Sequence, residues 1–501
     1  MHKNHKKAVS RSYSSVDKVL RSYSKKKPHK IVEQSEAIFG QLQKDMKSSV
    51  KAYDQFLRDN HITGINDFAH GLDKDNYLRR YSPQDLSWDG KFADGDWVIS
   101  ATSGSTGEPY YFPRTRMQDK QYEVTAEAYL VNNFSIDKHK TLYVVAYPMG
   151  IWIGGVFTYQ VISDIARKDK YDLTIVTPGI HKQHIIDSIK RLAPLYDQVI
   201  IGAYAPFLTD IIHDASKQGV NWKSLNVKFV FSAEAFPEQF RDYLKKEVGL
   251  KSIYKDTLNH YGTVDMGTMA HETPVSILIR RLLVKKGLLG DILPEAVRQP
   301  TLCQYDPTMF YFEEHDNTLY CSGYSGIPLI RYNLKDYGGV ISYSSMFERL
   351  AKVGIDLQQE IKKAGLENSA WTLPFVYVYE RNDFSVSYYA FNIYPEIIKQ
   401  GLCATPLSKK VTGKFTMTTE YTTKGRQRLI IFIELLPGIK KSKKLTTDLA
   451  ELMHKILLEK SVEYPEIFRV KGSVVKPMVE LRDYEDAEYF RPGGKQKWII
   501  K

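Results

Sequence analysis

The sequence has little cysteine: only Cys303, Cys321 and Cys403 occur among its 501 residues. These three are far apart and show no metal-ligand spacing, so they exclude a disulfide framework and a cysteine-based zinc site. We therefore expect three free thiols. Free thiols fit a reducing compartment, and a cytoplasmic location is expected.

The basic N-terminus lacks the apolar stretch that a secretory signal peptide needs. Up to Lys27 it carries nine lysines and arginines against a single acid, Asp17, which accounts for much of the formal charge of +12. Such runs are usually a solvated arm or the charged face of a helix. The segment has no aromatic platform of the kind that binds single-stranded nucleic acid, so no nucleic-acid partner is expected. We expect residues 1 to about 30 to be dispensable for activity.

No hydrophobic run has the character of a membrane helix. Residues 142–162 carry no charge and are long enough to span a bilayer, but Pro148, Gly150 and Gly154 interrupt them. A better division is a buried strand over 142–146, a glycine-rich loop over 147–155 and a helix over 156–166. The sequence therefore predicts one α/β unit here and no membrane span.

The same alternation continues along the chain without any sequence repeat. Apolar runs predict strands at 173–176, 198–202 and 227–232, and helical periodicity predicts helices at 184–192, 207–216 and 237–248. A further helical stretch lies at 37–57. Strands that alternate with helices indicate a mostly parallel sheet with helices on both faces. The expected fold class is α/β.

The chain also lacks a Walker A motif, although it has a loop suited to phosphate. Residues 102–109 read Thr-Ser-Gly-Ser-Thr-Gly-Glu-Pro and follow the apolar residues 97–99. Gly104 and Gly107 let the backbone approach an anion closely, and the flanking hydroxyl groups are donors. No lysine lies in this loop, which excludes the Walker type. A polar surface turn is the alternative interpretation.

Two further polar segments follow predicted strands. Residues 232–234 read Ser-Ala-Glu, and residues 260–265 read His-Tyr-Gly-Thr-Val-Asp. Ligands of open α/β sheets gather beyond the carboxyl ends of the strands. We therefore expect these segments and the loop after Thr102 to converge on one site.

Five segments together resemble the adenylate-forming superfamily of acyl-CoA synthetases, peptide-synthetase adenylation domains and luciferases. They are the loop at 102–109, Tyr-Gly-Thr-Val-Asp at 261–265, Pro-Leu-Ile-Arg-Tyr-Asn-Leu-Lys-Asp at 328–336, Arg-Asn-Asp at 381–383 with Asn-Ile-Tyr-Pro-Glu at 392–396, and Arg-Pro-Gly-Gly-Lys-Gln-Lys at 491–497. They occur in the family's order and cover nearly the whole chain after residue 90. The fourth segment is most similar to the phenylacetate-CoA ligase-like branch.

The resemblance implies a role for each matching residue. It implies that phosphate and nucleotide are bound by Thr102, Ser103, Gly104, Ser105, Thr106, Gly107, Ala233, Glu234, Tyr261, Gly262, Thr263 and Arg381. Asp336 would take the ribose hydroxyls, Asp265 would help to hold Mg²⁺, and Asp383 would be the hinge. Lys495 matches the catalytic lysine, and Lys497 is the alternative if the register is off by two.

Some residues depart from the pattern of this branch. Asp265 stands where glutamate is usual, Glu108 replaces a lysine that is frequent in the phosphate loop, and Ala390 replaces a glycine beside the pantetheine passage. About thirty residues, 338–370, are inserted before the hinge. Some members hold zinc after the Tyr-Gly segment, but no cysteine lies near residues 269–272, so we expect no zinc.

The implied organisation has three parts. A basic arm and a leading helical region occupy 1–90, a large domain with mostly parallel sheets flanked by helices occupies 91–380, and a small, mobile α+β domain occupies 381–501. The implied activity is ATP- and Mg²⁺-dependent activation of a carboxylic acid as acyl-AMP, with release of pyrophosphate and transfer to CoA. A carrier protein or an amine is the alternative acceptor.

A protein that binds nucleotide without catalysis, with its basic arm docked on an acidic partner, is the alternative of another class. For the enzyme, an aryl or medium-chain acyl group is expected against the uncharged loop that supplies Tyr147, Met149, Ile151, Trp152 and Gly155. These residues could equally be core.

Overall fold

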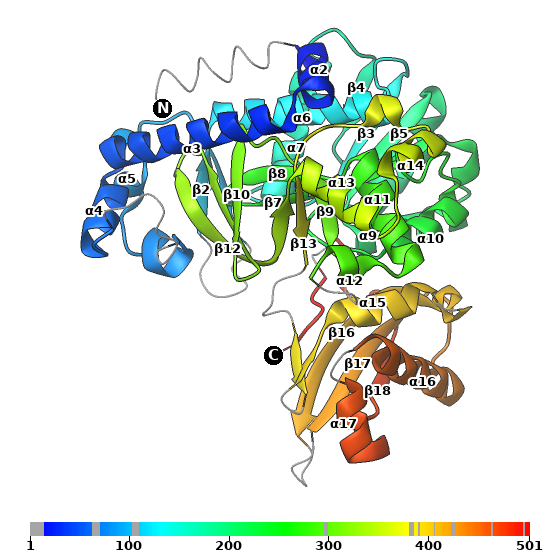
Figure 1. The fold of residues 1–501 in the computed structure, drawn as a ribbon. Coiled ribbons are helices and arrows are strands. Elements are labelled where there is room, and N and C mark those ends of the chain that lie inside the picture. Colours follow the sequence, from blue (N-terminus) through cyan, green and yellow to red (C-terminus); the bar gives the residue numbers. More distant parts are fainter. Residues whose placement is uncertain are drawn as a thin grey trace.

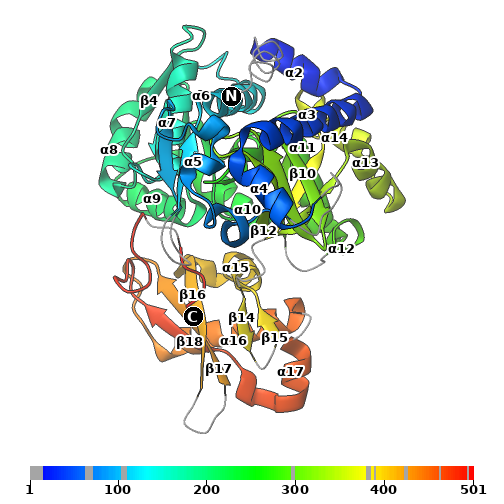
Figure 2. The same ribbon diagram turned by 90° about the vertical axis from the view of Figure 1, so that its left-hand side faces the viewer.

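A computed structural model describes residues 15–62, 71–102, 110–294, 299–379, 385–388, 391–404, 406–421, 427–461, 464–493 and 496–500. Figure 1 shows a large α/β body above a smaller unit formed by the C-terminal part of the chain, and Figure 2 shows the same two units from the side. An 11-stranded sheet in the order β10-β11-β12-β13-β9-β8-β7-β6-β5-β3-β4 forms the centre of the large body.

The parallel part of this sheet confirms the predicted α/β alternation. Its strands are β3 (Thr141–Ala146), β4 (Leu173–Val176), β5 (Gln198–Ala203), β6 (Val227–Phe231) and β7 (Thr257–Thr263). The helices between them are α7 (Ile153–Ala166), α8 (Lys182–Leu192), α9 (Ala205–Lys217) and α10 (Glu238–Val248). Most of these elements begin and end within three residues of the predicted bounds, because their apolar positions have the period of the element.

Side chains that alternate along β3 pack on two different helix layers. Leu142, Val144 and Ala146 belong to the core that contains α8, α9 and α10. Tyr143 and Val145 belong to the core formed with α7 and with α6 (Arg116–Phe134). Both faces of the sheet are therefore covered, as continuous apolar strands require. Among the described residues no helix is long and apolar enough to cross a membrane.

The other part of the large sheet is antiparallel, which the sequence analysis did not describe. Its strands are β8 (Gly267–His271), β9 (Thr301–Gln304), β10 (Phe310–His315), β11 (Thr318–Gly323), β12 (Leu329–Ile341) and β13 (Phe375–Val378). The inserted residues 338–370 complete β12 and then form α13 (Tyr343–Lys352) and α14 (Leu357–Lys363). Both helices share an apolar core with α11 (Pro274–Lys286). The insertion is thus part of the large domain's core.

From residue 15 onward the basic N-terminus forms helices with a charged outer face, which is the second of the two interpretations given for it. Helix α2 (Val16–Lys25) buries Val16, Val19 and Tyr23. Helix α3 (Pro28–Ser49) packs against β10 and β11, and Figure 1 shows it above β10. The Tyr23 hydroxyl donates to Asp306 at 2.9 Å. The cations lie on the outer faces of helices whose apolar positions are buried. Deleting residues 15–30 would therefore remove packed structure; residues 1–14 lie outside the described residues.

Strand β1 is not part of the large sheet, and the expected convergence of its loop with the other polar segments stays a prediction. β1 (Val98–Ala101) pairs only with β2 (Tyr111–Arg114), as an antiparallel hairpin. The glycine-rich loop is therefore the connection of a hairpin. It does not follow a strand of the parallel sheet.

The small unit has its own core. An antiparallel pair, β16 (Val411–Tyr421) and β17 (Gln427–Leu435), is extended by β18 (Met478–Arg482), which runs parallel to β17. The remaining elements are β14 (Val386–Tyr388), β15 (Phe391–Ile393), α15 (Pro395–Ala404), α16 (Lys443–Lys460) and α17 (Tyr464–Lys471). One apolar cluster joins α15, α16 and the three-stranded sheet. The C-terminal segment returns to this sheet, because Met417 forms a bridge with Ile499.

Candidate functional site

The two ends of the glycine-rich loop are held together. The Thr102 backbone N–H donates to the Tyr110 carbonyl at 3.0 Å, and the Tyr110 N–H donates to the Thr102 side-chain oxygen at 3.0 Å. The Tyr110 hydroxyl donates to the Leu78 carbonyl at 3.1 Å, which ties the hairpin to the leading helical region. The predicted phosphate-binding residues Ser103, Gly104, Ser105, Thr106 and Gly107 lie outside the described residues, as does Glu108. A loop with fixed ends has less conformational entropy to lose when it binds an anion.

The structure brings Tyr261 and Asp336 together, although 75 residues separate them in the sequence. Tyr261 lies in β7 and Asp336 in β12, and the tyrosine hydroxyl donates to the aspartate at 2.7 Å. Burial, together with the charge of Asp336, raises the pKa of Tyr261 well above its usual value. The hydroxyl therefore remains protonated and donates. One aromatic ring and one carboxylate thus lie side by side.

The predicted metal ligand Asp265 is buried in the turn between β7 and β8. Lys74 approaches it, with 3.8 Å between the ammonium nitrogen and the carboxylate. The hydroxyl of Tyr332 hydrogen-bonds to Asp265; burial and then this charge raise the pKa of Tyr332. The turn is short because the Met266 N–H bonds to the Thr263 hydroxyl at 3.2 Å. Asp265 therefore sits in a polar, fixed turn.

Gly262, which follows Tyr261, lies where two backbone segments approach closely. A Cβ on Gly262 would lie 2.5 Å from the carbonyl oxygen of Gly267, closer than real Cβ contacts. The two strands β7 and β8 therefore approach one another there in a way that only glycine allows. Gly262 itself is exposed.

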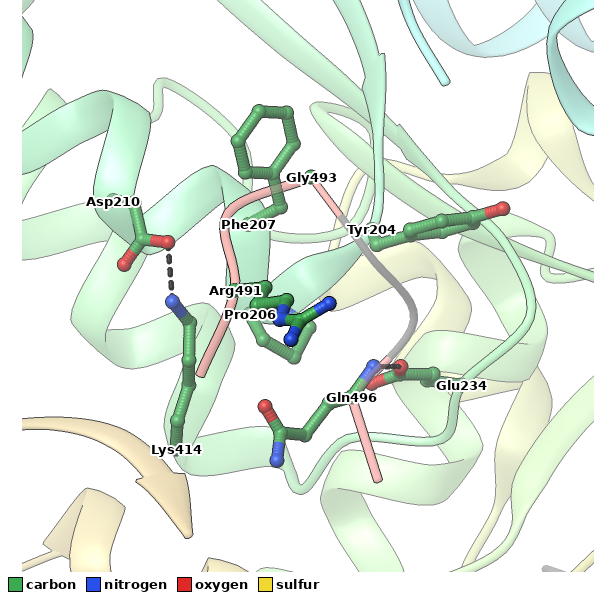
Figure 3. Close-up of a pocket in the computed structure, with 9 residues that line it drawn as sticks. All are labelled: Tyr204, Pro206, Phe207, Asp210, Glu234, Lys414, Arg491, Gly493 and Gln496. Atoms are coloured by element: carbon green, nitrogen blue, oxygen red, sulfur yellow. Dashed lines mark hydrogen bonds and ion pairs between the residues drawn. The ribbon is translucent and has the colours of Figure 1, made fainter. Parts of the chain in front are cut away.

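Glu234 connects the strand ends of the large domain to the C-terminal segment. Its carbonyl accepts from the Asn259 side chain at 2.9 Å, and its carboxylate accepts from the Gln496 backbone N–H at 3.3 Å (Figure 3). Ala233, just before it, is exposed and adopts a left-handed conformation with φ +71°. Such a conformation is uncommon for a residue with a Cβ and marks a sharp, fixed turn.

Arg381, the hinge residue Asp383 and the lysine Lys495 lie outside the described residues, and so does Ala390. The alternative lysine, Lys497, is described and exposed. Gln496, between the two lysines, is the residue that reaches Glu234.

A small cavity lies where the large and small domains meet, and sequence analysis missed most of its residues. Figure 3 shows its lining: Tyr204, Pro206, Phe207, Asp210, Glu234, Lys414, Arg491, Gly493 and Gln496. Lys414 of β16 forms an ion pair with Asp210 of α9. A lone lysine in a strand has no local sequence signature. Asp210 and Asp214 lie one helical turn apart, and this spacing of two acids was the one signal in the sequence that could have indicated an acidic helix face here.

The five residues predicted for an acyl pocket do not line this cavity. Tyr147 is fully buried in the core, and its hydroxyl donates to the Val230 carbonyl at 2.6 Å. Ile151 and Trp152 are exposed to 43% and 40%. A Cβ on Gly155 would lie 2.3 Å from the carbonyl oxygen of Pro148 and 2.7 Å from Met149, so this glycine allows a tight turn. For Tyr147 the structure shows a core residue.

A buried network of charges supports the strand end at Glu234. Arg241 of α10 is fully buried and forms ion pairs with Glu238 and Glu272. Glu272 also accepts from the Asn259 backbone N–H at 2.9 Å, and Asn259 in turn holds the Glu234 carbonyl. Burial alone would raise the pKa of Glu238, but three nearby arginines hold this pKa below its usual value. For Glu272, burial raises the pKa, and Arg241 and Arg280 only partly oppose it. The ion pairs and hydrogen bonds of the network fix this edge.

No family model and no curated protein matches the sequence. Solved structures of 2-hydroxyisobutyryl-CoA ligase are similar to the chain. One, in the postadenylation state with R3-HIB-AMP, has a TM-score of 0.62 at 13% identity and covers 96% of this chain and 91% of that chain. Another, in the thioesterification state with 2-HIB-AMP and CoA, has a TM-score of 0.51 at 14% identity over 96% and 91%.

These similarities show that the chain shares the fold of 2-hydroxyisobutyryl-CoA ligase. Both solved structures contain the same ligase in different states. The higher TM-score belongs to the postadenylation state, so the arrangement of this chain is more like that state than like the thioesterification state.

Proposed function

We propose that the protein is an adenylate-forming acid ligase, which uses ATP to activate a carboxylic acid as acyl-AMP. One contact carries this proposal. Gln496, adjacent to Lys495 in the sequence, donates its backbone N–H to Glu234 at the carboxyl end of the parallel strands. A lysine-bearing segment that docks on the edge where α/β sheets bind ligands fits a reaction between two anions.

The residues around this contact divide the work of the reaction. In the proposal, Tyr261 and Asp336 hold the nucleoside, and the hydroxyl and amide groups of the loop after Thr102 hold the phosphates. Lys495 neutralises charge as the substrate carboxylate attacks the α-phosphate and pyrophosphate leaves. A carboxylate is a poor electrophile, and the mixed anhydride with AMP supplies a good leaving group.

The chemistry of Asp265 fits Mg²⁺. Magnesium is usually bound by one or two carboxylates together with substrate phosphates, and Asp265 offers one buried carboxylate in a fixed turn. Lys74 is about one-third exposed and 3.8 Å away, so it can move aside. When bound, the ion would neutralise phosphate charge.

ATP–pyrophosphate exchange with a panel of aryl and medium-chain acids tests this activity. We expect exchange with at least one acid, and its loss in Lys495→Ala. Transfer from a supplied acyl-AMP should continue in this variant, because the lysine acts on the first step. Loss of exchange in Lys497→Ala, with exchange kept in Lys495→Ala, would move the assignment by two residues. Wild-type protein without exchange for any acid would favour the non-catalytic alternative.

Two further substitutions separate the proposed roles of the carboxylates. Asp265→Asn should weaken the use of ATP in a way that higher Mg²⁺ partly restores, because a ligand is lost. Asp336→Ala should weaken it without such rescue, because the ribose contact and the Tyr261 hydrogen bond are lost. Equal responses to Mg²⁺ would contradict this division.

We further propose a phenylacetate-CoA ligase-like enzyme with CoA as acceptor. The segments at 381–383 and 392–396 and the CoA-bound relative support this choice. Ala390 should narrow the pantetheine passage, because a methyl group stands where glycine allows close approach. Ala390→Gly should then raise thioester formation and leave adenylation unchanged. Transfer to an amine or a carrier protein, with only background turnover of CoA, would replace this acceptor.

A further inference from the structure

An acidic stripe on α9 receives the small domain. Asp210 and Asp214 lie one helical turn apart on this helix of the large domain. Asp210 is fully buried and forms its ion pair with Lys414 of β16, and the Lys414 ammonium lies 3.3 Å from Glu434 of β17. The buried Lys414 thus connects Asp210 of the large domain with Glu434 of the small domain, to which Lys414 itself belongs.

Asp214 makes the second contact of the stripe. Lys182 of α8 lies 2.5 Å from it and also forms an ion pair with Glu485 of the small domain. The Tyr484 hydroxyl donates to Asp214 at 3.0 Å. The two contacts are coupled, because the Glu485 backbone N–H donates to the Glu434 carboxylate at 2.7 Å.

The two contacts differ in their exposure to solvent. The side chains of Asp210 and Glu434 are 0% exposed and that of Lys414 is 6% exposed, whereas Lys182 and Glu485 are 19% and 29% exposed. A charge buried without a partner is costly, and removing one member of a buried pair leaves the other uncompensated. Because the members belong to different domains, separation of the domains would return the uncompensated charge to water.

The C-terminal segment leaves this interface and continues to the strand ends. Gly493 packs on Ile180, in the turn before α8, so closely that a Cβ would lie 2.6 Å from the Ile180 Cβ. Three residues later, Gln496 reaches Glu234. Contacts of the large domain therefore hold the C-terminal segment on both sides of Lys495, at Gly493 and at Gln496. This segment follows Tyr484 and Glu485 in the sequence.

We propose that the contacts of Asp210 and Asp214 form a domain latch, which holds the small domain where its C-terminal segment reaches Glu234. The latch consists of Lys182, Asp210, Asp214, Lys414, Glu434, Tyr484 and Glu485. Its lysines are positioning residues for adenylate formation, and they have no part in acyl transfer. This inference rests on the proposed function.

Solution X-ray scattering of the full chain tests the latch without any substrate. Lys414→Met keeps the length of the side chain and removes its charge, and we expect a larger radius of gyration as the domains separate. Lys476→Met is the matched control: Lys476 pairs with Glu451 at 3.0 Å inside the small domain, on its surface. Circular dichroism checks that both variants are folded, and Lys182→Met provides a second variant if Lys414→Met is not.

The two half-reactions give a second measurement, made with whichever acid supports exchange. Lys414→Met should slow ATP–pyrophosphate exchange by about 100-fold, since misplacement by about 1 Å costs that much. Acyl transfer from supplied acyl-AMP should stay at the wild-type rate. Equal slowing of both steps, or an unchanged radius of gyration in folded Lys414→Met and Lys182→Met, would overturn the latch. Absence of exchange in the wild type would refute the proposed function, whereas the scattering result would still decide whether these contacts hold the domains together.

Discussion

Two ionic clusters in this protein differ in their balance of charge. In the large domain, Glu238 and Glu272 face three arginines, two of them fully buried. At the domain interface, one lysine faces two buried acids, Asp210 and Glu434. Because Arg281 also pairs with the exposed Asp242, cations and acids balance in the first cluster, within one domain. The second cluster has a surplus of acid between two domains.

The pKa values of the acids reflect this difference. The arginines hold the pKa of Glu238 below its usual value despite its burial, whereas burial raises the pKa of Glu272 in the same cluster. At the interface, burial raises the pKa of Asp210 to about 7, and Lys414 and Lys182 only partly oppose it. A saturated cluster suits a contact that never opens, whereas an acid short of cations suits a contact that separates. We infer that the first cluster is permanent and the second is reversible.

The largest effect is expected from breaking the permanent cluster. Arg241→Met leaves Glu238 and Glu272 buried with fewer partners, and it should reduce the free energy of unfolding of the large domain by about 3–5 kcal/mol. Urea denaturation followed by a probe in this domain measures the loss. Arg79→Met, which breaks an exposed pair with Asp75, is the control and should cost under about 1 kcal/mol. Similar losses in both variants would mean that the buried network adds no stability.

The next effect concerns pH and the reversible cluster. In separated domains Asp210 would be hydrated and its pKa would return toward 3.8, whereas in the closed arrangement it is about 7. Closing therefore binds a proton between these values, so closure should weaken as pH rises through this window and stay level above it. Lys182 and Lys414 lower the pKa and Glu434 raises it, so the window depends on all three.

Scattering at about pH 5 and about pH 8 measures this dependence. We expect a larger radius of gyration at the higher pH in the wild type. In Asp210→Asn the radius of gyration should differ less between the two pH values than in the wild type, whatever its absolute size. A wild-type protein with the same dimensions at both pH values would contradict the assignment of this proton to the interface.

The smallest effect is expected at the outer contact of the latch. Lys182→Met breaks pairs that are partly exposed, and exposed pairs contribute about 0.2–1 kcal/mol. Pyrophosphate exchange should therefore fall only a few-fold, about 2- to 5-fold. Added salt should slow the wild type toward the variant, because salt screens exposed charges more than buried ones. A loss as large as that of Lys414→Met would show that burial does not separate the two contacts.

The parallel part of the sheet could be predicted from the sequence because its signals are local. Strand β4 has the predicted bounds, and α8 and α9 begin only two residues before the predicted helices. At the N-terminus the sequence left a solvated arm and a charged helix face open, and from residue 15 onward the structure shows the helix. The cations at 18–27 obscured the buried positions 16, 19 and 23, whose spacing of three and four is that of a helix face.

The candidate site could be predicted in part, for a related reason. Tyr261 and Asp336 lie in segments that match a known pattern, and the structure places them in contact. Nothing local indicates that Lys414 meets Asp210, because 204 residues separate them and each belongs to an ordinary amphipathic element. Contacts between domains depend on how two surfaces fit, and this information is spread over both.

The close packing of Gly493 affects which substitutions this position would tolerate under selection for a functional protein. Gly438 and Gly472 also have positive φ, but open space surrounds the place of their Cβ, so substitutions there would cost only backbone strain. At Gly493 even one methyl group would collide with Ile180 of the other domain. In a library covering every position, the small domain's turn glycines would tolerate replacement to graded degrees. Whether a substitution at Gly493 is tolerated would depend on the large domain, because a side chain there would need a smaller residue at position 180.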